Sequence, residues 1–308
     1  MQWWCSATGQ PWTWEWRAYP GVWLFVVLLG IWYWWETAGR WNRQTPRRPG
    51  QQGPEVSAPG DNHKDDRPPV RLSDRLWFLT GLAALWIALD WPLGALGAGY
   101  LASFHTTSYI LLSVIAPPCL LLGIPLELQR RAATSARWGR LLRFFGRPWF
   151  GLVCYASVQL ITHVPQVVDG AMATQVGALL IDVAWLAAGF ALWWPVMGPS
   201  PEVVQISRPL KMGYLFFSTL PTIVPSAFLT FADFPLYATY ELAPRIFPIL
   251  TALEDQKLAG VLMKIVGDLP VWFAFGVIFF RWAREESDKP QPVHPGVVGV
   301  GPSDRPTV

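Results

Sequence analysis

The chain has 308 residues, of which 52% are hydrophobic and only 15% charged, and its mean hydropathy is positive. Soluble domains are about 25% charged, so this composition indicates a membrane protein. The formal net charge is only +3, and we expect membrane lipid rather than nucleic acid as a partner. The three cysteines (Cys5, Cys119 and Cys154) are too few and too scattered for a disulfide framework or a cysteine-rich metal site.

Seven apolar segments approach the ~20 residues that a membrane-spanning helix needs. None shows the alternation of a membrane β-strand, and open backbone cannot face lipid, so the sequence predicts helices. The predicted fold is an all-α polytopic membrane bundle of seven transmembrane helices. They are expected at Pro20–Trp35, Leu76–Trp91, Phe104–Leu126, Pro148–Pro165, Val176–Met197, Leu210–Phe231 and Ala259–Trp282.

The remaining segments divide the chain into domains and connections. Residues 1–19 form a tryptophan-rich segment without the basic start of a cleaved signal peptide, and residues 20–35 form the first transmembrane helix. Residues 36–75 are expected to be a disordered linker and residues 286–308 a disordered tail, on either side of a six-helix membrane domain at 76–285. Within that domain we expect a Gly-rich hairpin at Leu93–Ala102, a basic amphipathic helix after Leu126 and an acidic loop at Ala232–Leu258.

Lysines and arginines predict the orientation, since cytoplasmic connections carry more of them. The stretch from Arg40 to Arg75 supplies eight basic residues, and that from Arg130 to Arg147 supplies six. Two alternate connections, Leu93–Ala102 and Gln166–Gln175, contain none. The N-terminus is therefore expected outside and the C-terminus in the cytoplasm.

With this orientation, the ionisable residues in or next to the helices gather in the outer half of the membrane. A charge in lipid costs a few kcal/mol, so those inside the helices should face the bundle interior and be paired. The sequence thus predicts a polar interior site open to the outer side. Its candidate residues are Asp90, His105, His163, Asp182, Asp233, Glu254, Asp255, Lys264 and Asp268.

Several of these residues also have a structural explanation. Lys264 and Asp268 have the i,i+4 spacing of an ion pair within one helix, and Asp90 and Asp233 lie at helix ends, where caps are common. Imidazole and carboxylate together could hold copper or zinc, although no spacing here identifies a metal. The candidate ligands are His105, His163 and Asp182.

No nucleophile elbow, P-loop, dinucleotide fingerprint or HExxH motif is present, so we do not expect an enzyme. Prolines in the third and sixth predicted helices free backbone carbonyls and should kink them. These are Pro117, Pro118, Pro221 and Pro225. A secondary transporter would favour two matching halves, and no internal repeat appears.

Five segments within Leu76–Glu285 resemble the CtaG family of cytochrome c oxidase assembly factors, and they follow the family's order. They are HTTSYILLSVIAPPCLLLGIP, THVP, AWLAAGFALWWPVMGP, LTFADFPLYATY and, most specifically, LEDQKLAGVLMKI. The resemblance implies a seven-helix protein of the bacterial inner membrane that assists maturation of a haem-copper oxidase. It also implies membrane histidines as copper ligands and oxidase subunits as partners.

The chain departs from the family pattern at three expected histidines. Tyr109 stands four residues after His105, where relatives usually carry a second imidazole, and Ala178 and Asp182 replace a histidine pair in the fifth helix. These departures, with 20 tryptophans, leave a second hypothesis open. The protein would then be a non-catalytic accessory subunit of a respiratory or photosynthetic complex that kept the fold and lost the ligands.

Overall fold

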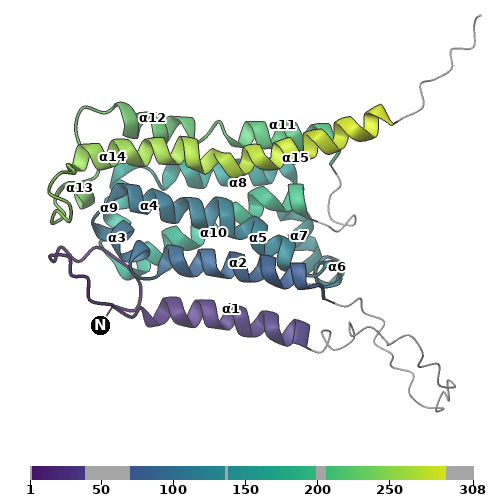
Figure 1. Cartoon of the computed structure of the whole chain (residues 1–308), viewed down its shortest axis with the longest axis horizontal. Helices are drawn as coiled ribbons and strands as arrows, with labels where there is room; N and C mark the ends of the chain where they lie inside the picture. Colours follow the sequence, from purple (N-terminus) through teal and green to yellow (C-terminus); the bar gives the residue numbers. More distant parts are fainter. Residues whose placement is uncertain (1, 39–69, 136–137, 199–205, 289–308) are drawn as a thin grey trace, which may run out of the picture.

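Helices lie side by side along one axis in the computed structural model, which describes residues 2–38, 70–135, 138–198 and 206–288 (Figure 1). This part of the chain contains no strand, so the all-α prediction is confirmed for it. The helices that lie within the long apolar runs are α1 (Pro20–Ala38), α2 (Leu72–Leu89), α4 (Ala102–Tyr109), α5 (Ala116–Gly123), α8 (Pro148–Ile161), α10 (Gln175–Met197), α11 (Arg208–Ser218), α12 (Ile223–Phe231), α14 (Ala252–Val261) and α15 (Gly267–Ser287). The helices at the two ends of the bundle are α3 (Leu93–Gly99), α6 (Leu126–Thr134), α7 (Trp138–Phe145), α9 (Pro165–Met172) and α13 (Ala238–Glu241).

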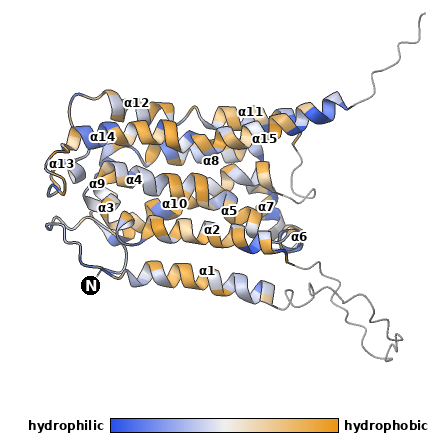
Figure 2. Ribbon diagram, viewed as in Figure 1, coloured by the Kyte–Doolittle hydropathy of each residue, from blue (hydrophilic) through white to orange (hydrophobic). Residues whose placement is uncertain are grey.

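Six helical runs of the described chain are long and apolar enough to cross a membrane. A seventh is added if α8 and α9, which meet at an angle of 77°, count as one span. Apolar residues cover the middle of the bundle and polar ones its two ends (Figure 2). The chain therefore has the build of a multi-pass membrane protein.

The third span is continuous but changes its helical geometry before its prolines. Between α4 and α5 lies the π-helix η2 (Ile110–Ile115), in which Ala116 N bonds the carbonyl of Leu111, five residues back. Pro117 and Pro118 lack the N–H that an α-helix would direct to the carbonyls four residues earlier. The wider π turn lies directly before these prolines, so the irregularity expected there includes a local change of winding.

The sixth and seventh spans are both irregular, and their irregular parts are in contact. As the prolines predict, the sixth is divided, into α11 and α12 with Pro221 between them. The seventh, Ala252–Ser287, contains a second π-helix, η3 (Leu262–Val266), between α14 and α15. Lys264, within η3, donates a hydrogen bond to Thr219 at the end of α11. The π-helix of the seventh span therefore lies next to the break in the sixth.

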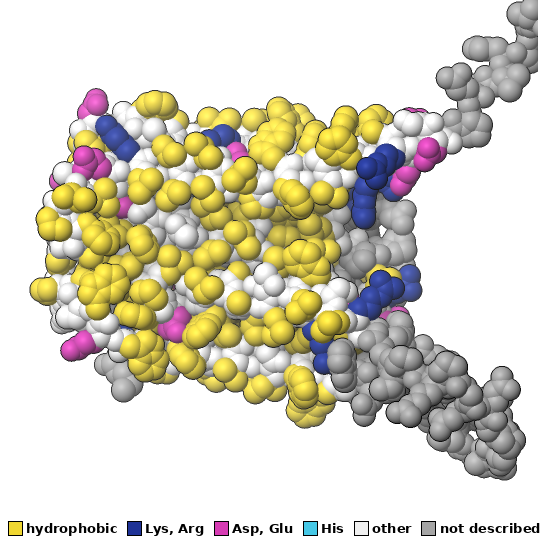
Figure 3. Space-filling model, in the orientation of Figure 1, with side chains coloured by type: hydrophobic (Ala, Val, Ile, Leu, Met, Phe, Trp, Pro, Cys, Tyr) yellow, Lys and Arg dark blue, Asp and Glu magenta, His cyan; other side chains and the backbone are white. Residues whose placement is uncertain are grey.

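The two ends of the bundle differ in charge. We call the end with residues 2–19, α3, α9 and α13 the N-terminal end, and the opposite end, with α6, α7 and the last turns of α15, the basic end (Figure 1). Lys and Arg side chains gather at the basic end (Figure 3). The first and last described residues lie at opposite ends, as an odd number of crossings requires.

Three connections differ from the sequence-based expectations. The expected hairpin Leu93–Ala102 is largely the helix α3, and the basic segment after Leu126 forms two helices, α6 and α7, rather than one. The expected loop Ala232–Leu258 contains α13 and the start of α14, because a capping box of Thr251 and Glu254 begins that helix at Ala252.

Helix also extends into segments expected to be disordered. The α1 helix continues to Ala38, α2 begins at Leu72 and α15 continues to Ser287. Residues 39–69 and 289–308, where most of the predicted linker and tail fall, lie outside the described residues.

The core runs along α2, the third span and α10. Its largest fully buried side chains include Trp185, Trp193, Tyr109 and Phe78. The α1 helix is peripheral, with Val22, Tyr33 and Thr37 as its buried residues. It is held in part by Tyr33, which stacks on Phe78 at 3.7 Å and donates a hydrogen bond to the carbonyl of Gly123.

Candidate functional site

The two histidines of interest both pack against one buried tryptophan. Trp185 of α10 is fully buried, and its ring centroid is 4.9 Å from that of His105 on α4 and 6.2 Å from that of His163 after α8. The Trp185 indole donates a hydrogen bond of 2.8 Å to Thr162 Oγ1. Since Thr162 immediately precedes His163, this bond fixes the end of α8 against α10. The structure thus brings together two of the predicted site residues.

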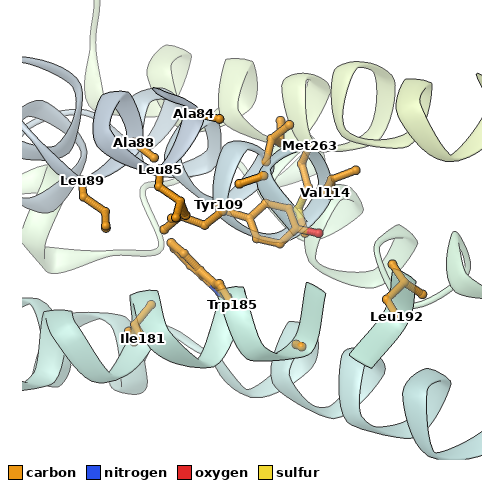
Figure 4. Packing of buried hydrophobic residues seen from close by; sticks show 14 of the residues in the cluster. Ala84, Leu85, Ala88, Leu89, Tyr109, Val114, Ile181, Trp185, Leu192 and Met263 are labelled. Atoms are coloured by element: carbon orange, nitrogen blue, oxygen red, sulfur yellow. The ribbon is translucent and has the colours of Figure 1, made fainter. Parts of the chain in front are cut away.

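Tyr109 completes this aromatic group from the helix that carries His105. Its ring is 5.5 Å from Trp185, beside which it lies in Figure 4, and 5.4 Å from His163. The Tyr109 hydroxyl is 2.6 Å from that of Tyr155, and both side chains are buried. Tyr109 therefore uses its polar atom within the protein, at the position where the resemblance implied an imidazole.

His163 has a defined tautomer. Its Nδ1 is 2.8 Å from the backbone carbonyl of Gln159, and a carbonyl oxygen only accepts, so Nδ1 carries the proton in the neutral ring. Its Nε2 then presents a lone pair, and this atom is buried without a hydrogen-bond partner in the described chain. The Nε2 of His105 is likewise buried and unpartnered there.

Asp182 is reached from the N-terminal segment. It lies between Ile181 and Val183 on α10, and its Oδ2 accepts a hydrogen bond of 2.8 Å from Trp4 Nε1. The Trp4 backbone N–H also bonds Gln175 Oε1 at 3.2 Å, and Cys5 Sγ donates to the Leu89 carbonyl at 3.1 Å. The N-terminal segment therefore closes over the interior of the bundle.

A small cavity lies beneath this segment. Its walls include Cys5, His105, Asp182 and Trp185. The volume open to the centre of a water molecule is about 20 Å³. That space is enough for a water molecule but not for an organic ligand. His105 and Asp182 thus share a cavity, whereas His163 lines a separate apolar groove with residues of α8 and α12.

Asp255 caps the helix that carries His105. It is buried on α14 and accepts backbone hydrogen bonds from Ala102 at 2.6 Å and Ser103 at 3.3 Å, together with one from the Ser103 hydroxyl. A carboxylate at a helix N-terminus satisfies free N–H groups and complements the helix dipole. The neighbouring Glu254 is exposed and caps α14 itself through Thr251. Both acidic residues thus have structural roles.

Lys264 and Asp268 form an ion pair at the break in the sixth span. Their Nζ and Oδ2 atoms are 2.7 Å apart, and Lys264 Nζ also donates to the Thr219 carbonyl at the end of α11. Asp268 accepts from the hydroxyl of Thr222, the residue before α12. The cation therefore stands at a helix C-terminus and the anion at a helix N-terminus, the arrangement that both helix dipoles favour.

This pair lies deeper than the sequence indicated. Thr219 and Thr222 are near the middle of the 24-residue run Arg208–Phe231, so Lys264 and Asp268 are about halfway through the bundle. The prediction placed them in the outer half because it began the seventh span at Ala259, seven residues after the helix starts.

The two remaining predicted residues lie at the N-terminal end and form no hydrogen bond with either histidine in the described chain. Asp90 follows α2 and accepts a hydrogen bond from Trp86 Nε1 at 2.8 Å, and its burial raises the pKa of its carboxyl group. Asp233 is exposed in the segment after α12. Neither residue shares the group around Trp185 formed by His105, Tyr109 and His163.

The region of the chain that is similar to known proteins coincides with these helices. A family model described as "Cytochrome c oxidase caa3 assembly factor" matches residues 61–285, which include every helix from α2 to most of α15. The chain belongs to the caa3 cytochrome c oxidase assembly factor family. This confirms the resemblance seen in the five sequence segments.

Three mycobacterial proteins are similar to this assembly factor over part of their length. Uncharacterized proteins Mb0105 of Mycobacterium bovis and MT0111 of Mycobacterium tuberculosis are each 22% identical over 226 residues. Uncharacterized protein ML1998 of Mycobacterium leprae is 19% identical over 236 residues. In all three cases the match covers 68% of this chain and 34% of the relative, so the chain spans about a third of their length. No solved structure matches it.

The residues of this assembly factor family member do not fit a copper site of three or four ligands. Within the described residues, no three His, Cys, Asp or Glu side chains are grouped so that they could hold one ion. Asp182 is hydrogen-bonded to Trp4, and Tyr109 to Tyr155. The candidate ligand atoms that remain are the unpartnered Nε2 atoms of His105 and His163. Imidazole nitrogen suits copper, but the rest of the ligand set is missing.

Sequence reasoning missed the residues that organise this site. Trp185, Trp4 and Tyr155 were not among the candidates, although each binds or contacts one that was. Trp185 follows Asp182 by three residues and so lies near its helical face, which was an available signal. No sequence signal indicates that Trp4 reaches α10, because the two are 178 residues apart.

Proposed function

We propose that this protein assists the assembly of a caa3-type cytochrome c oxidase in a bacterial cytoplasmic membrane. The observation that carries the proposal is the family match over residues 61–285, which covers nearly all of the helical bundle. Its partners are membrane lipid and oxidase subunits, it acts without catalysing a reaction, and it binds no nucleic acid.

We further propose that the N-terminal end faces the outside and the basic end the cytoplasm. Arginines and lysines supply the support, since the described chain carries several of them on the helices and connections of the basic end. They are Arg130, Arg131, Arg140, Arg143, Arg147, Arg208, Lys211, Arg281 and Arg284. In this orientation His105, His163 and Asp182 lie in the outer part of the membrane.

The copper branch of the proposal has narrower support. His105 and His163 each have a buried Nε2 atom without a partner in the described chain, and no step of the proposed function passes through a bound metal. Purification under copper, followed by metal analysis of the wild-type protein and of His105→Ala and His163→Ala, tests it. Stoichiometric copper that is lost in both variants would support a copper role, and its absence in the wild type would reject one.

A second candidate function is that of a permanent accessory subunit of a respiratory or photosynthetic complex. It is favoured by the loss of three expected imidazoles, two of which have become the hydrogen-bonded side chains Tyr109 and Asp182. Capture of the tagged protein from native membranes separates the candidates. An assembly factor is captured with immature oxidase subunits and is absent from the purified mature enzyme, whereas an accessory subunit remains with the mature complex at constant stoichiometry.

A further inference from the structure

An apolar groove runs along the outer face of α15 and ends at two arginines. It has a volume of about 430 Å³ and is lined by Trp272, Phe273, Gly276, Val277 and Phe280, followed by Arg281 and Arg284. From Trp272 to Phe280 the helix rises roughly 12 Å, at ~1.5 Å per residue. The groove is therefore long, apolar and charged at one end.

The groove faces away from the rest of the bundle. Phe273 is 75% exposed and Phe280 66% exposed, so in a membrane both contact lipid. A Cβ atom added to Gly276 would meet no other atom within 4 Å, so this glycine leaves a notch in the wall. Trp272, at the far end, is held by an edge contact with Phe216 of α11 and a tilted contact with Phe275. The Trp272 end of the groove is thus fixed by packing, while the notch at Gly276 is unfilled.

The two arginines are three residues apart and lie on one side of α15 near its end. Both are exposed, and neither forms an ion pair with a described residue, whereas Arg208 close by is paired with Glu285. Guanidinium groups bind phosphate through paired N–H donors, and two of them exceed the charge of a single phosphodiester. Their position at the basic end is the level at which lipid headgroups meet a spanning helix.

The acidic residues of this helix end do not cancel the arginines within the groove. Glu285 is engaged by Arg208, and Glu286 follows Arg284 by two positions, which places it on the opposite side of the helix. Asp288 lies beyond the last helical turn, further from the groove than Arg284. The charge that meets a ligand in the groove is therefore positive.

We propose that this groove is a binding site for one anionic phospholipid. The phosphate lies between Arg281 and Arg284, and an acyl chain follows the apolar wall from Phe280 to Trp272 with the Gly276 notch beneath it. A net negative headgroup is preferred over a zwitterionic one, because both arginines are otherwise unneutralised. This inference is independent of the oxidase partner.

Native mass spectrometry of the full chain in detergent tests the site, with phosphatidylglycerol and phosphatidylcholine of identical acyl chains as probes. The wild type should retain one phosphatidylglycerol at concentrations where it retains no phosphatidylcholine. Arg281→Ala and Arg284→Ala should each weaken phosphatidylglycerol binding about fivefold, since a basic residue near an anionic lipid surface contributes ~1 kcal/mol. Arg281→Lys keeps the charge and should lose less.

A second pair of variants tests the apolar wall. Gly276→Phe fills the notch and should reduce phosphatidylglycerol retention at least as much as loss of one arginine. The matched control is Gly213→Phe on α11, where an added Cβ also meets no atom within 4 Å, and it should bind as the wild type does. Equal retention of both lipids by the wild type, or unchanged retention in Gly276→Phe and both arginine variants, would overturn the proposal and leave ordinary annular lipid.

Discussion

The indole of Trp4 donates a hydrogen bond of 2.8 Å to the carboxyl group of Asp182, and so joins the N-terminal segment to the interior of α10. With the Cys5 contact to Leu89 and the Trp4 contact to Gln175, this bond holds the segment over the cavity that His105 and Asp182 line. The N-terminal end of the bundle is thus closed by residues far away in sequence.

Replacement of this tryptophan should therefore destabilise the protein. Trp4→Phe keeps the apolar ring but leaves Asp182 without its donor, at a cost of about 1–3 kcal/mol. Thermal unfolding in detergent measures the loss. The control is Trp16→Phe, a 60% exposed tryptophan of the same segment, which should leave the midpoint nearly unchanged. Equal effects of the two substitutions would refute the role of the bond.

The ion pair at the break in the sixth span should be sensitive to loss of one partner. Lys264→Met leaves the Asp268 carboxylate and the Thr219 carbonyl without their cation, and we expect a cost of about 3 kcal/mol. The double variant Lys264→Met/Asp268→Leu removes both charges and should recover much of the stability. Arg131→Ala, which breaks the exposed pair with Glu127, serves as the control and should cost under ~1 kcal/mol.

A double variant as unstable as Lys264→Met alone would contradict the view that the cost arises from an unpaired Asp268 carboxylate. In that case the charges of the pair would have a role that the contacts with Thr219 and Thr222 do not account for.

Asp255 should control the start of the helix that carries His105. Asp255→Ala removes three hydrogen bonds from the first turn of α4 and should destabilise the protein by about 2 kcal/mol. Hydrogen exchange should rise first at Ala102 and Ser103. Asp233→Ala, at an exposed position, is the control, and protection at Ala102 that does not change in Asp255→Ala would contradict the cap.

The incomplete ligand set around Trp185 leads to a gain-of-function prediction. Wild-type protein should hold less copper than Tyr109→His, because the substitution places an imidazole beside His163. Metal analysis after dialysis checks both, with Tyr109→Phe as the control for loss of the hydroxyl. Stoichiometric copper in the wild type would show that the two existing histidines suffice.

Sequence patterns predicted most of the architecture because spanning helices depend on local composition. Apolar runs located the helices, and Pro221 marked the break between α11 and α12. The start of α14 could also have been predicted, because Thr251 and Glu254 have the spacing of a capping box. The π-helices η2 and η3 could not, since such insertions depend on how a helix packs against its neighbours.

The candidate site was predicted in part. His105 and His163 do come together around Trp185, because His105 lies in the first turn of α4 and His163 just after the end of α8. The acidic residues instead divide among helix caps and an ion pair, roles that depend on partners distant in sequence, such as Ala102 for Asp255. Charge position alone therefore did not indicate which of these residues have structural partners.

Assembly of the oxidase in a strain that lacks this protein tests the central proposal most directly. Oxidase subunits in the membrane are quantified together with the haem spectrum and oxygen consumption, with and without a plasmid copy of the gene. The account predicts that mature caa3-type oxidase falls severalfold while its subunits are still made, and that the plasmid copy restores it. Full oxidase content and activity in the deletion strain would contradict the account.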